Sequence, residues 1–140
     1  MTQNPHPPGT VPDSTVKMQV DAFDVSEFAR LLGMRVTEAR DGYARVIMNS
    51  SEKKNAHGVA HGGAIFSLAD HAFGVAANCG GIDRVAVSVH IQYLVPATGD
   101  LVAVANRVAD NGKYSTYRVM VYDGERTVAA FDGVALMVSA

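Results

Sequence analysis

The sequence predicts an α+β fold in which one curved antiparallel sheet wraps around a single long helix. Residues 62–78 are apolar on almost every side, which is typical of a helix that is buried rather than lying on a surface. Residues 84–95 alternate between apolar and polar side chains, which is the period of a strand. Turn signals such as Asp123-Gly124 separate the later apolar runs, and antiparallel strands joined by tight turns need no crossover helices.

One folded domain is expected after a proline-rich tail. Four of the five prolines lie in the first twelve residues, and proline is disfavoured inside helices and in the middle of sheets. Residues 1–15 are therefore predicted to form a flexible tail. The remaining residues, 16–140, suffice for one hydrophobic core and leave little room for a second.

The predicted helices and strands follow one another in a simple order. The first helix covers residues 24–33, with Asp24 as its cap, Phe28 and Leu31 on its apolar face, and Gly33 as its end. A hairpin with an Asp-Gly turn, the long helix and four further strands follow. The predicted ranges of these elements are 34–39, 43–48, 62–78, 84–95, 101–109, 114–122 and 126–138.

The composition argues against several classes of protein. Hydrophobic residues make up 48% of the chain and charged residues 19%, which is typical of a globular protein. The net charge of -2 argues against a nucleic-acid partner, because phosphate binding needs a basic surface. The single cysteine, Cys79, excludes an intramolecular disulfide. Since neither a secretory signal nor a membrane span is recognisable, we expect a cytoplasmic protein without a membrane partner.

Asp70 is the residue of the long helix whose burial would cost the most free energy. It is the only formally charged residue between Gly62 and Asn78, and aspartate is a poor residue for a helix interior. Burial of a carboxylate costs several kcal/mol unless the group is paired or hydrogen-bonded. Either Asp70 is solvated or salt-bridged on a stripe of the helix that is not buried, or the protein uses it for chemistry, and the residues alone weigh these two interpretations evenly.

The start of the same helix offers groups that attract negative charge. Gly62 and Gly63 follow His61, and the backbone N–H groups of a first helical turn have no partner inside the helix. Glycine lets a ligand approach these groups closely, and the helix dipole favours negative charge at this end. A carbonyl oxygen that gains charge in a transition state could be stabilised there. Glycines needed only for a tight turn into the helix would give the same pattern.

The spacing of Gly62 and Asp70 has a consequence for assembly. The two residues are eight positions apart, which separates them by about 12 Å along a helix. They cannot both reach one small reacting group from the same chain. If both act on one substrate, the site combines Gly62 of one chain with Asp70 of another. Pairing of two sheets across a symmetry axis would also cover the exposed sheet edges.

Residues 55–70 resemble the signature of the PaaI-like (phenylacetate-degradation) hotdog thioesterases. The segment reads Asn-Ala-His-Gly-Val-Ala-His-Gly-Gly-Ala-Ile-Phe-Ser-Leu-Ala-Asp. The family has the same Asn, the same His-Gly-Gly and the same Asp at these spacings. The later segment 93–97, Tyr-Leu-Val-Pro-Ala, is also similar, and the resemblance extends over residues 24–138. It implies a hotdog fold and hydrolysis of acyl-CoA thioesters to free acid and CoA, without a cofactor or a metal.

The resemblance also implies a role for individual residues. Asp70 would act as general base or nucleophile on the thioester carbonyl, and the backbone N–H of Gly62 would polarise the carbonyl oxygen. Asn55 would position the water or the carboxylate, and His61 would shape the start of the helix and hydrogen-bond near the thioester. The substrate-binding residues expected around them are Gly63, Phe66, Phe73, Ser88 and Lys113.

One position departs from the family pattern. Many relatives carry Ser or Thr seven residues before the aromatic residue of the later segment, where this chain has Ala86. Ser88, two residues on and expected to face the same side, is the candidate replacement. The CoA phosphates should meet basic residues, of which Lys113 follows an Asn-Gly turn. Further candidates for phosphate binding are Arg84, Arg107, Arg118, Lys53 and Lys54.

Several alternatives stay open. The acyl group is either aryl-acetyl or a short-to-medium aliphatic chain, and the family implies a homodimer and often a homotetramer. A non-catalytic module that binds acyl-CoA or an aryl ligand is the first alternative, although binding alone has no use for a desolvated Asp70. A hotdog hydratase or dehydratase is the second, but it needs a catalytic His paired with an acid. His57, His61, Asp70 and His71 lack the spacing of a full metal-ligand set.

Overall fold

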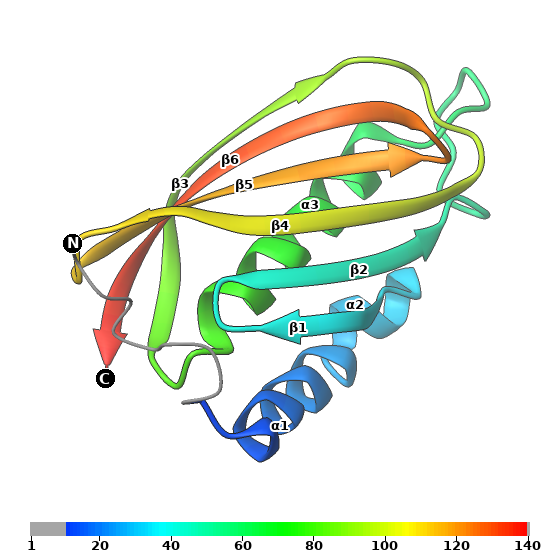
Figure 1. Ribbon diagram of the computed structural model, residues 1–140. Coiled ribbons are helices and arrows are strands. Elements are labelled where there is room, and N and C mark those ends of the chain that lie inside the picture. Colours follow the sequence, from blue (N-terminus) through cyan, green and yellow to red (C-terminus); the bar gives the residue numbers. More distant parts are fainter. Residues whose placement is uncertain (1–10, 140) are drawn as a thin grey trace.

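The computed structural model describes residues 11–139 as one sheet wrapped around a long helix (Figure 1). The six strands form a single antiparallel sheet in the order β1-β2-β4-β5-β6-β3. In the described part of the chain, no helix is long and apolar enough to cross a membrane. The elements are α1 (Asp13–Asp24), α2 (Glu27–Leu32), β1 (Arg35–Arg40), β2 (Tyr43–Asn49), α3 (Gly62–Asn78), β3 (Asp83–Tyr93), β4 (Asp100–Asp110), β5 (Tyr114–Asp123) and β6 (Arg126–Ser139).

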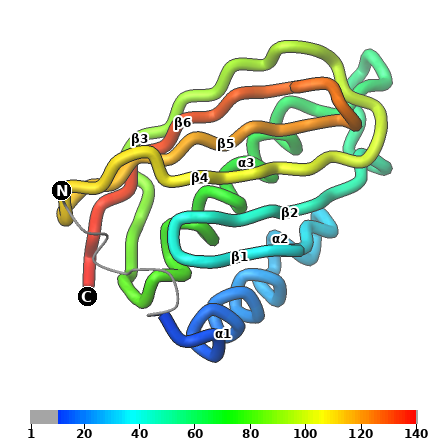
Figure 2. The backbone as a smooth tube through the Cα atoms, in the orientation of Figure 1, coloured from blue at the N-terminus to red at the C-terminus, as the bar shows by residue number. Residues whose placement is uncertain are grey.

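Helix α3 lies against the inner face of the sheet, and Figure 2 shows the strands curving over it. Its buried side chains are mainly alanines and other aliphatic residues, which let the helix approach the strands closely. The ring of Phe73 packs against Tyr117 and Phe131, with ring centroids 5.3 and 5.7 Å away. Gly133 makes room for this ring, because a Cβ there would lie 2.9 Å from Phe73. The predicted sheet around a central helix is therefore confirmed.

The hairpin β1–β2 has the predicted Asp-Gly turn, and the side chains of β2 alternate in burial. Ala44, Val46 and Met48 are buried, whereas the intervening residues of β2 are half-buried. Gly42 has a φ of 78°, which is the left-handed conformation that a tight Asp-Gly turn requires. The turn places Asp41 beside β4, where it is held by an arginine described below.

The N-terminal segment differs from the prediction. Residues 13–15, assigned to the tail, form the first turn of α1, and residues 1–10 lie outside the described residues. The missed signal is the spacing of Val16, Val20 and Phe23, which pack against the core at four- and three-residue intervals. The prolines lie before this helix, where they do not interrupt it.

The short helix α2 also differs in part from the prediction. Asp24 does not cap it: its carboxylate accepts a hydrogen bond of 2.9 Å from the Val36 N–H. Gly33 ends α2 with a φ of 70°, as predicted. Phe28 and Leu31, expected on a packed apolar face, are 56% and 76% exposed in the single chain.

Among residues 11–139, strand β3 forms one edge of the sheet and pairs only with β6. Val85, Val87 and Val89 on this strand are 47%, 51% and 37% exposed. An edge strand with exposed valines presents free backbone groups and apolar side chains together, which favours pairing with a second chain.

Candidate active site

The first turn of α3 presents one free backbone amide. His61 is the N-cap residue, and its Nδ1 accepts a hydrogen bond of 2.8 Å from the Gly63 N–H. The Gly62 N–H, in contrast, has no acceptor within residues 11–139. One amide of the turn is therefore used by the cap, and its neighbour remains available.

Tyr93 holds the carbonyl group of the same residue, Gly62. Its hydroxyl donates a hydrogen bond of 3.0 Å to the carbonyl oxygen of Gly62. The Tyr93 ring would lie 3.4 Å from a Cβ placed on Gly62, so the aromatic ring rests directly on the glycine. Strand β3 thereby holds the start of α3 from one side. No pattern in the sequence indicates this bond.

Asn55 borders the same cavity as Gly62, in a loop that its own side chain stabilises. The Oδ1 of Asn55 accepts hydrogen bonds from the N–H groups of His57 at 2.9 Å and Val59 at 3.3 Å. These bonds fix the amide orientation and leave Nδ2 as the group that can donate to a ligand. Asn55, Gly62 and Tyr93 line a cavity of about 340 Å³, which we call the Tyr93 pocket.

Asp70 lies in the middle of α3 and is exposed in the single chain, contrary to the expectation of a buried carboxylate. The sheet covers the opposite side of the helix and leaves open a stripe that includes Gly63 and Asp70. No hydrogen bond or salt bridge to Asp70 occurs in the described part of the chain. Although the residue is accessible, neighbouring atoms remove enough water to raise the pKa of its carboxyl group.

A cavity of about 270 Å³, which we call the Asp70 pocket, lies next to this carboxylate. Phe23 of α1 forms one wall: its ring meets His71 edge-on, with centroids 5.5 Å apart. The same ring lies close to Gly74, where a Cβ would approach it to 3.2 Å. Phe73 also borders the pocket. Burial lowers the pKa of His71, with Asp24 opposing this effect, so the imidazole is neutral near pH 7.

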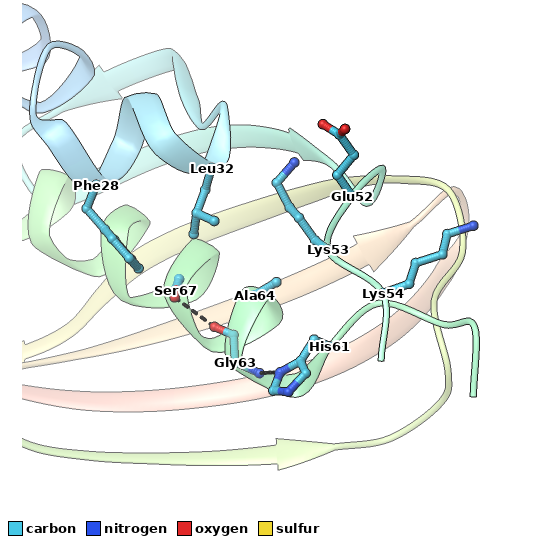
Figure 3. Close-up of a pocket in the computed structure, with 9 residues that line it drawn as sticks. All are labelled: Phe28, Leu32, Glu52, Lys53, Lys54, His61, Gly63, Ala64 and Ser67. Atoms are coloured by element: carbon cyan, nitrogen blue, oxygen red, sulfur yellow. Dashed lines mark hydrogen bonds between the residues drawn. The ribbon is translucent and has the colours of Figure 1, made fainter. Parts of the chain in front are cut away.

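A third cavity, of about 480 Å³, lies between α2, the loop before α3 and the first two turns of α3 (Figure 3). We call it the lysine pocket, because Lys53 and Lys54 stand at its rim. The Ser67 hydroxyl in its wall donates a hydrogen bond of 2.7 Å to the Gly63 carbonyl. The residues that line it are Phe28, Leu32, Glu52, Lys53, Lys54, His61, Gly63, Ala64 and Ser67.

Two of the cations proposed for phosphate binding are already engaged in the protein interior. Arg84 donates hydrogen bonds of 3.2 Å to the Tyr117 hydroxyl and 3.4 Å to Asp110. Arg107 donates to the same hydroxyl at 3.1 Å and to Asp41 at 2.7 Å. This network joins α3 to three strands, and its guanidinium groups are not free for an external phosphate.

The remaining predicted residues fall into separate places. Phe66 is half-buried against Phe131, with ring centroids 5.7 Å apart. Lys113 lies in the turn after β4, at the end of the sheet opposite to the loop that precedes α3 (Figure 1). Within one chain the structure thus groups the predicted residues around the start of α3 and around Asp70, and leaves Lys113 apart from both.

The expectation that Ser88 faces the same side as Ala86 is wrong. A β-bulge shifts the register between these two residues, and a bulge changes the side to which the following side chains point. Ala86 lines the Asp70 pocket, whereas Ser88 lines a different cavity together with Thr116 and Arg118. Within residues 11–139, no group of three or more His, Cys, Asp or Glu side chains is placed to hold a metal ion.

The sequence is similar to proteins of known family. The model of the thioesterase superfamily matches residues 57–130. The acyl-coenzyme A thioesterase PaaI of Escherichia coli is 36% identical over 109 residues, which cover 75% of this chain and 78% of that protein. A candidate esterase of Archaeoglobus fulgidus is 42% identical over 103 residues, which cover 71% of this chain and 67% of that protein.

The fold is similar to solved structures. The Escherichia coli PaaI protein from the phenylacetic acid degradation operon has a TM-score of 0.85 at 28% identity, over 91% of this chain and 96% of that one. A mutant of the phenylacetic acid degradation protein PaaI from Thermus thermophilus has a TM-score of 0.77 at 33% identity, over 81% and 100% of the two chains. These likenesses confirm the predicted hotdog fold.

Proposed function

Because this chain belongs to the thioesterase superfamily, in its PaaI-like branch, we propose that it hydrolyses acyl-CoA thioesters at a site assembled from two copies of the chain. Membership of the superfamily makes the protein a thioester hydrolase. The observation that carries the proposal is a pair of unused groups on one helix: the Gly62 N–H and the Asp70 carboxylate. About 12 Å of helix separates them, so one chain cannot apply both to one carbonyl.

A two-fold axis beside Phe66 would bring these groups together. Phe66 lies four positions after Gly62 and four before Asp70, so antiparallel α3 helices that cross there place each glycine opposite the partner's aspartate. The unpaired edge of β3, with its exposed valines, supports pairing on the same side of the molecule. The homodimer is thus part of the proposal, and it contains two identical sites. A tetramer formed from two such dimers is a further proposal.

The mechanism follows from the two groups. The thioester oxygen accepts a hydrogen bond from the Gly62 N–H, and Asn55 Nδ2 donates either to the same oxygen or to the attacking water. Asp70 of the other chain removes a proton from water, whose oxygen attacks the carbonyl carbon. The tetrahedral intermediate collapses with cleavage of the C–S bond, and the proton passes to the CoA sulfur. Alternatively, Asp70 attacks the carbon itself, the C–S bond breaks and CoA leaves as the thiolate, and water then hydrolyses the mixed anhydride to the free acid and the Asp70 carboxylate.

The acyl group that we propose is aryl-acetyl or a short-to-medium aliphatic chain, which the PaaI name of the relatives supports. A cytoplasmic location is also part of the proposal. Cys79 is a buried free thiol, which suits a reducing compartment.

Release of free thiol from a panel of acyl-CoA thioesters tests the proposal, with Asp70→Asn beside the wild type. Burial, followed by the charge of Asp41, raises the pKa of the Cys79 thiol to about 11, so this residue should add little to the signal. Asp132→Asn is the matched control, because Asp132 lies exposed on the sheet and pairs with Arg118.

We expect hydrolysis by the wild type and the control, and a loss of about 10³-fold or more in Asp70→Asn, as for removal of a principal catalytic group. Tight binding of acyl-CoA by all three proteins without release of thiol would contradict the proposal and indicate a binding module. Hydration of an enoyl thioester without thiol release would indicate a hydratase.

A further inference from the structure

We propose that the Asp70 pocket receives the acyl group of the substrate and that Phe23 of α1 limits the size of the acyl group that fits. The inference rests on the proposed function and deepens it, because it assigns the acyl group and the CoA portion of the thioester to two different pockets. It makes Phe23 a residue that determines substrate specificity.

The charges of the lysine pocket and of the Asp70 pocket indicate which one receives CoA and which one receives the acyl group. CoA carries several phosphate charges, and the lysine pocket presents Lys53 and Lys54 against the single carboxylate of Glu52 (Figure 3). The Asp70 pocket instead presents a carboxylate without a cationic partner in the described part of the chain. Phosphates are attracted to the first and repelled by the second. The uncharged acyl group of the substrate therefore belongs in the Asp70 pocket.

The one guanidinium in the Asp70 pocket does not reverse this assignment. Arg84 is buried, and it donates to the Ala77 carbonyl and the Tyr117 hydroxyl, each at 3.2 Å, and to Asp110 at 3.4 Å. A cation held by these three acceptors is neutralised inside the protein. His71, the remaining basic side chain of the pocket, faces the Phe23 ring.

The shape of the Asp70 pocket suits a compact acyl group. Its volume is about 270 Å³, and Ala77, Ala86 and Ala135 contribute small side chains to its lining. Phe23 is the large side chain that another element, α1, adds to this pocket. A single aromatic ring or a short chain fits the space, whereas a long chain has to displace Phe23.

Gly74 supports the role of Phe23 as a wall. Glycine in a helix interior is normally destabilising relative to alanine, so its presence in α3 needs a local reason. A Cβ at this position would come within 3.2 Å of the Phe23 ring, closer than almost all real contacts of a Cβ. Gly74 thus gives the ring its place beside the pocket, one helical turn after Asp70.

Phe23 is also a side chain that can be shortened without opening the core. Helix α1 contains no buried residue, and Phe23 itself is half-buried on the surface of α3. Removal of its ring therefore enlarges the pocket and leaves the central packing intact. Val20, one turn earlier on α1, packs against the core without lining the pocket and serves as the matched control.

The experiment compares the acyl-chain preference of Phe23→Ala, Val20→Ala and the wild type. The readout is the ratio of kcat/KM for dodecanoyl-CoA to that for phenylacetyl-CoA. Each additional methylene that becomes buried contributes about fourfold, so we expect Phe23→Ala to raise the ratio by roughly tenfold or more. Val20→Ala should leave the ratio unchanged. An unchanged ratio in a folded, active Phe23→Ala protein would overturn the inference.

Binding of non-hydrolysable thioether analogues separates this inference from the proposed function. The dodecyl and phenylethyl thioethers of CoA give the same comparison of affinities by calorimetry, whether or not the protein hydrolyses thioesters. A shift of affinity toward the dodecyl analogue in Phe23→Ala supports the pocket assignment even if no thiol is released. Equal affinity ratios in all three proteins would overturn it even if hydrolysis is observed.

Discussion

The Nδ1 of His61 accepts a hydrogen bond of 2.8 Å from the Gly63 N–H, and this bond caps helix α3. It uses the amide of Gly63 and leaves the amide of Gly62 without an acceptor among the described residues. The cap therefore decides which N–H of the first turn can bind a carbonyl oxygen. It also fixes the backbone that carries this N–H.

Replacement of His61 separates its cap from any further role. His61→Ala removes the acceptor, and loss of an N-cap typically costs about 1 kcal/mol of stability. His61→Asn supplies another good N-cap acceptor and should restore most of that loss. We expect kcat to fall in His61→Ala and to recover in His61→Asn, as measured by denaturant unfolding and by thioester hydrolysis. If Asn restores stability but not kcat, the imidazole has a role beyond the cap.

Tyr93 is expected to position the Gly62 amide. Tyr93→Phe deletes the hydrogen bond of 3.0 Å to the Gly62 carbonyl and keeps the ring that rests on the glycine. The net contribution of such a bond is about 0.5–1.5 kcal/mol, so kcat should fall by roughly two- to tenfold while KM stays within twofold. Tyr122→Phe is the matched control, because no hydrogen bond of its hydroxyl occurs in the described structure. A change in KM alone would contradict a positioning role.

Asp70 should lower stability where it is ionised. Burial raises the pKa of its carboxyl group above the ordinary value of 3.8. A raised pKa in the folded state gives a stabilisation that is complete below the ordinary pKa and is lost as the pH rises through the folded value. We therefore expect Asp70→Asn to melt at a higher temperature than the wild type at pH 7, with a difference that shrinks on acidification.

The raised pKa of Asp70 also predicts how the rate of hydrolysis changes at acidic pH. If ionised Asp70 acts as base or nucleophile, kcat should rise with pH through a pKa above 3.8. Melting curves and rates measured over one pH series test both statements. Asp132→Asn, which removes the charge of an exposed ion pair on the sheet, should gain no stability at pH 7. A wild type more stable than Asp70→Asn at pH 7 would indicate a structural partner for the carboxylate.

The parts of the fold with a strong hydrophobic period could be predicted from the sequence. The helix at 62–78 was predicted at its observed bounds, and each strand within two residues at either end. The sequence does not predict α1, because the prolines that precede it indicate a longer tail. Its signal, Val16, Val20 and Phe23 at helical spacing, is weak because none of these residues is fully buried.

The site was harder to predict because its groups belong to different surfaces. A sequence that is apolar around a helix does not tell which stripe the sheet leaves open, so Asp70 was expected to be buried. Arg84 and Arg107 are predicted to be free for phosphates, because no neighbouring residue in the sequence indicates that they are paired. Their carboxylate partners lie far along the chain: Asp110 is 26 positions from Arg84, and Asp41 is 66 positions from Arg107. The bulge after Ala86 depends on pairing with β6 and has no local signal.

The Arg107–Asp41 pair is expected to stabilise the fold rather than to bind substrate. The two groups lie 2.7 Å apart, and their side chains are only 14% and 9% exposed. Burial alone would lower the pKa of Arg107, but the hydrogen bonds with Asp41 and Tyr117 outweigh burial and raise it. Asp41→Asn leaves this charge without its partner and should cost about 3–5 kcal/mol in denaturant unfolding.

The exposed pair formed by Arg118 and Asp132 gives the comparison for Asp41→Asn. Its side chains are 61% and 48% exposed, and such pairs contribute about 1 kcal/mol or less. Asp132→Asn should therefore change stability much less than Asp41→Asn. Equal losses in the two variants would show that the interior network is not maintained by charge pairing.

Complementation between two inactive variants tests most directly the claim that two chains share each site. Gly62→Pro removes the free N–H at the first helical position, where proline is tolerated, and the extended ψ of 137° at His61 suits a following proline. Asp70→Asn removes the carboxylate. Co-expression of both variants gives mixed dimers in which one site has both mutations and the other site has neither.

If the site is shared, each variant alone is inactive. A random mixture of the two variants recovers roughly a quarter of the wild-type activity per chain, because half of the dimers are mixed and each mixed dimer has one intact site of two. If Gly62 and Asp70 act within one chain, every chain in the mixture has a defect. The mixture then has no more activity than its components, and that result would contradict the account.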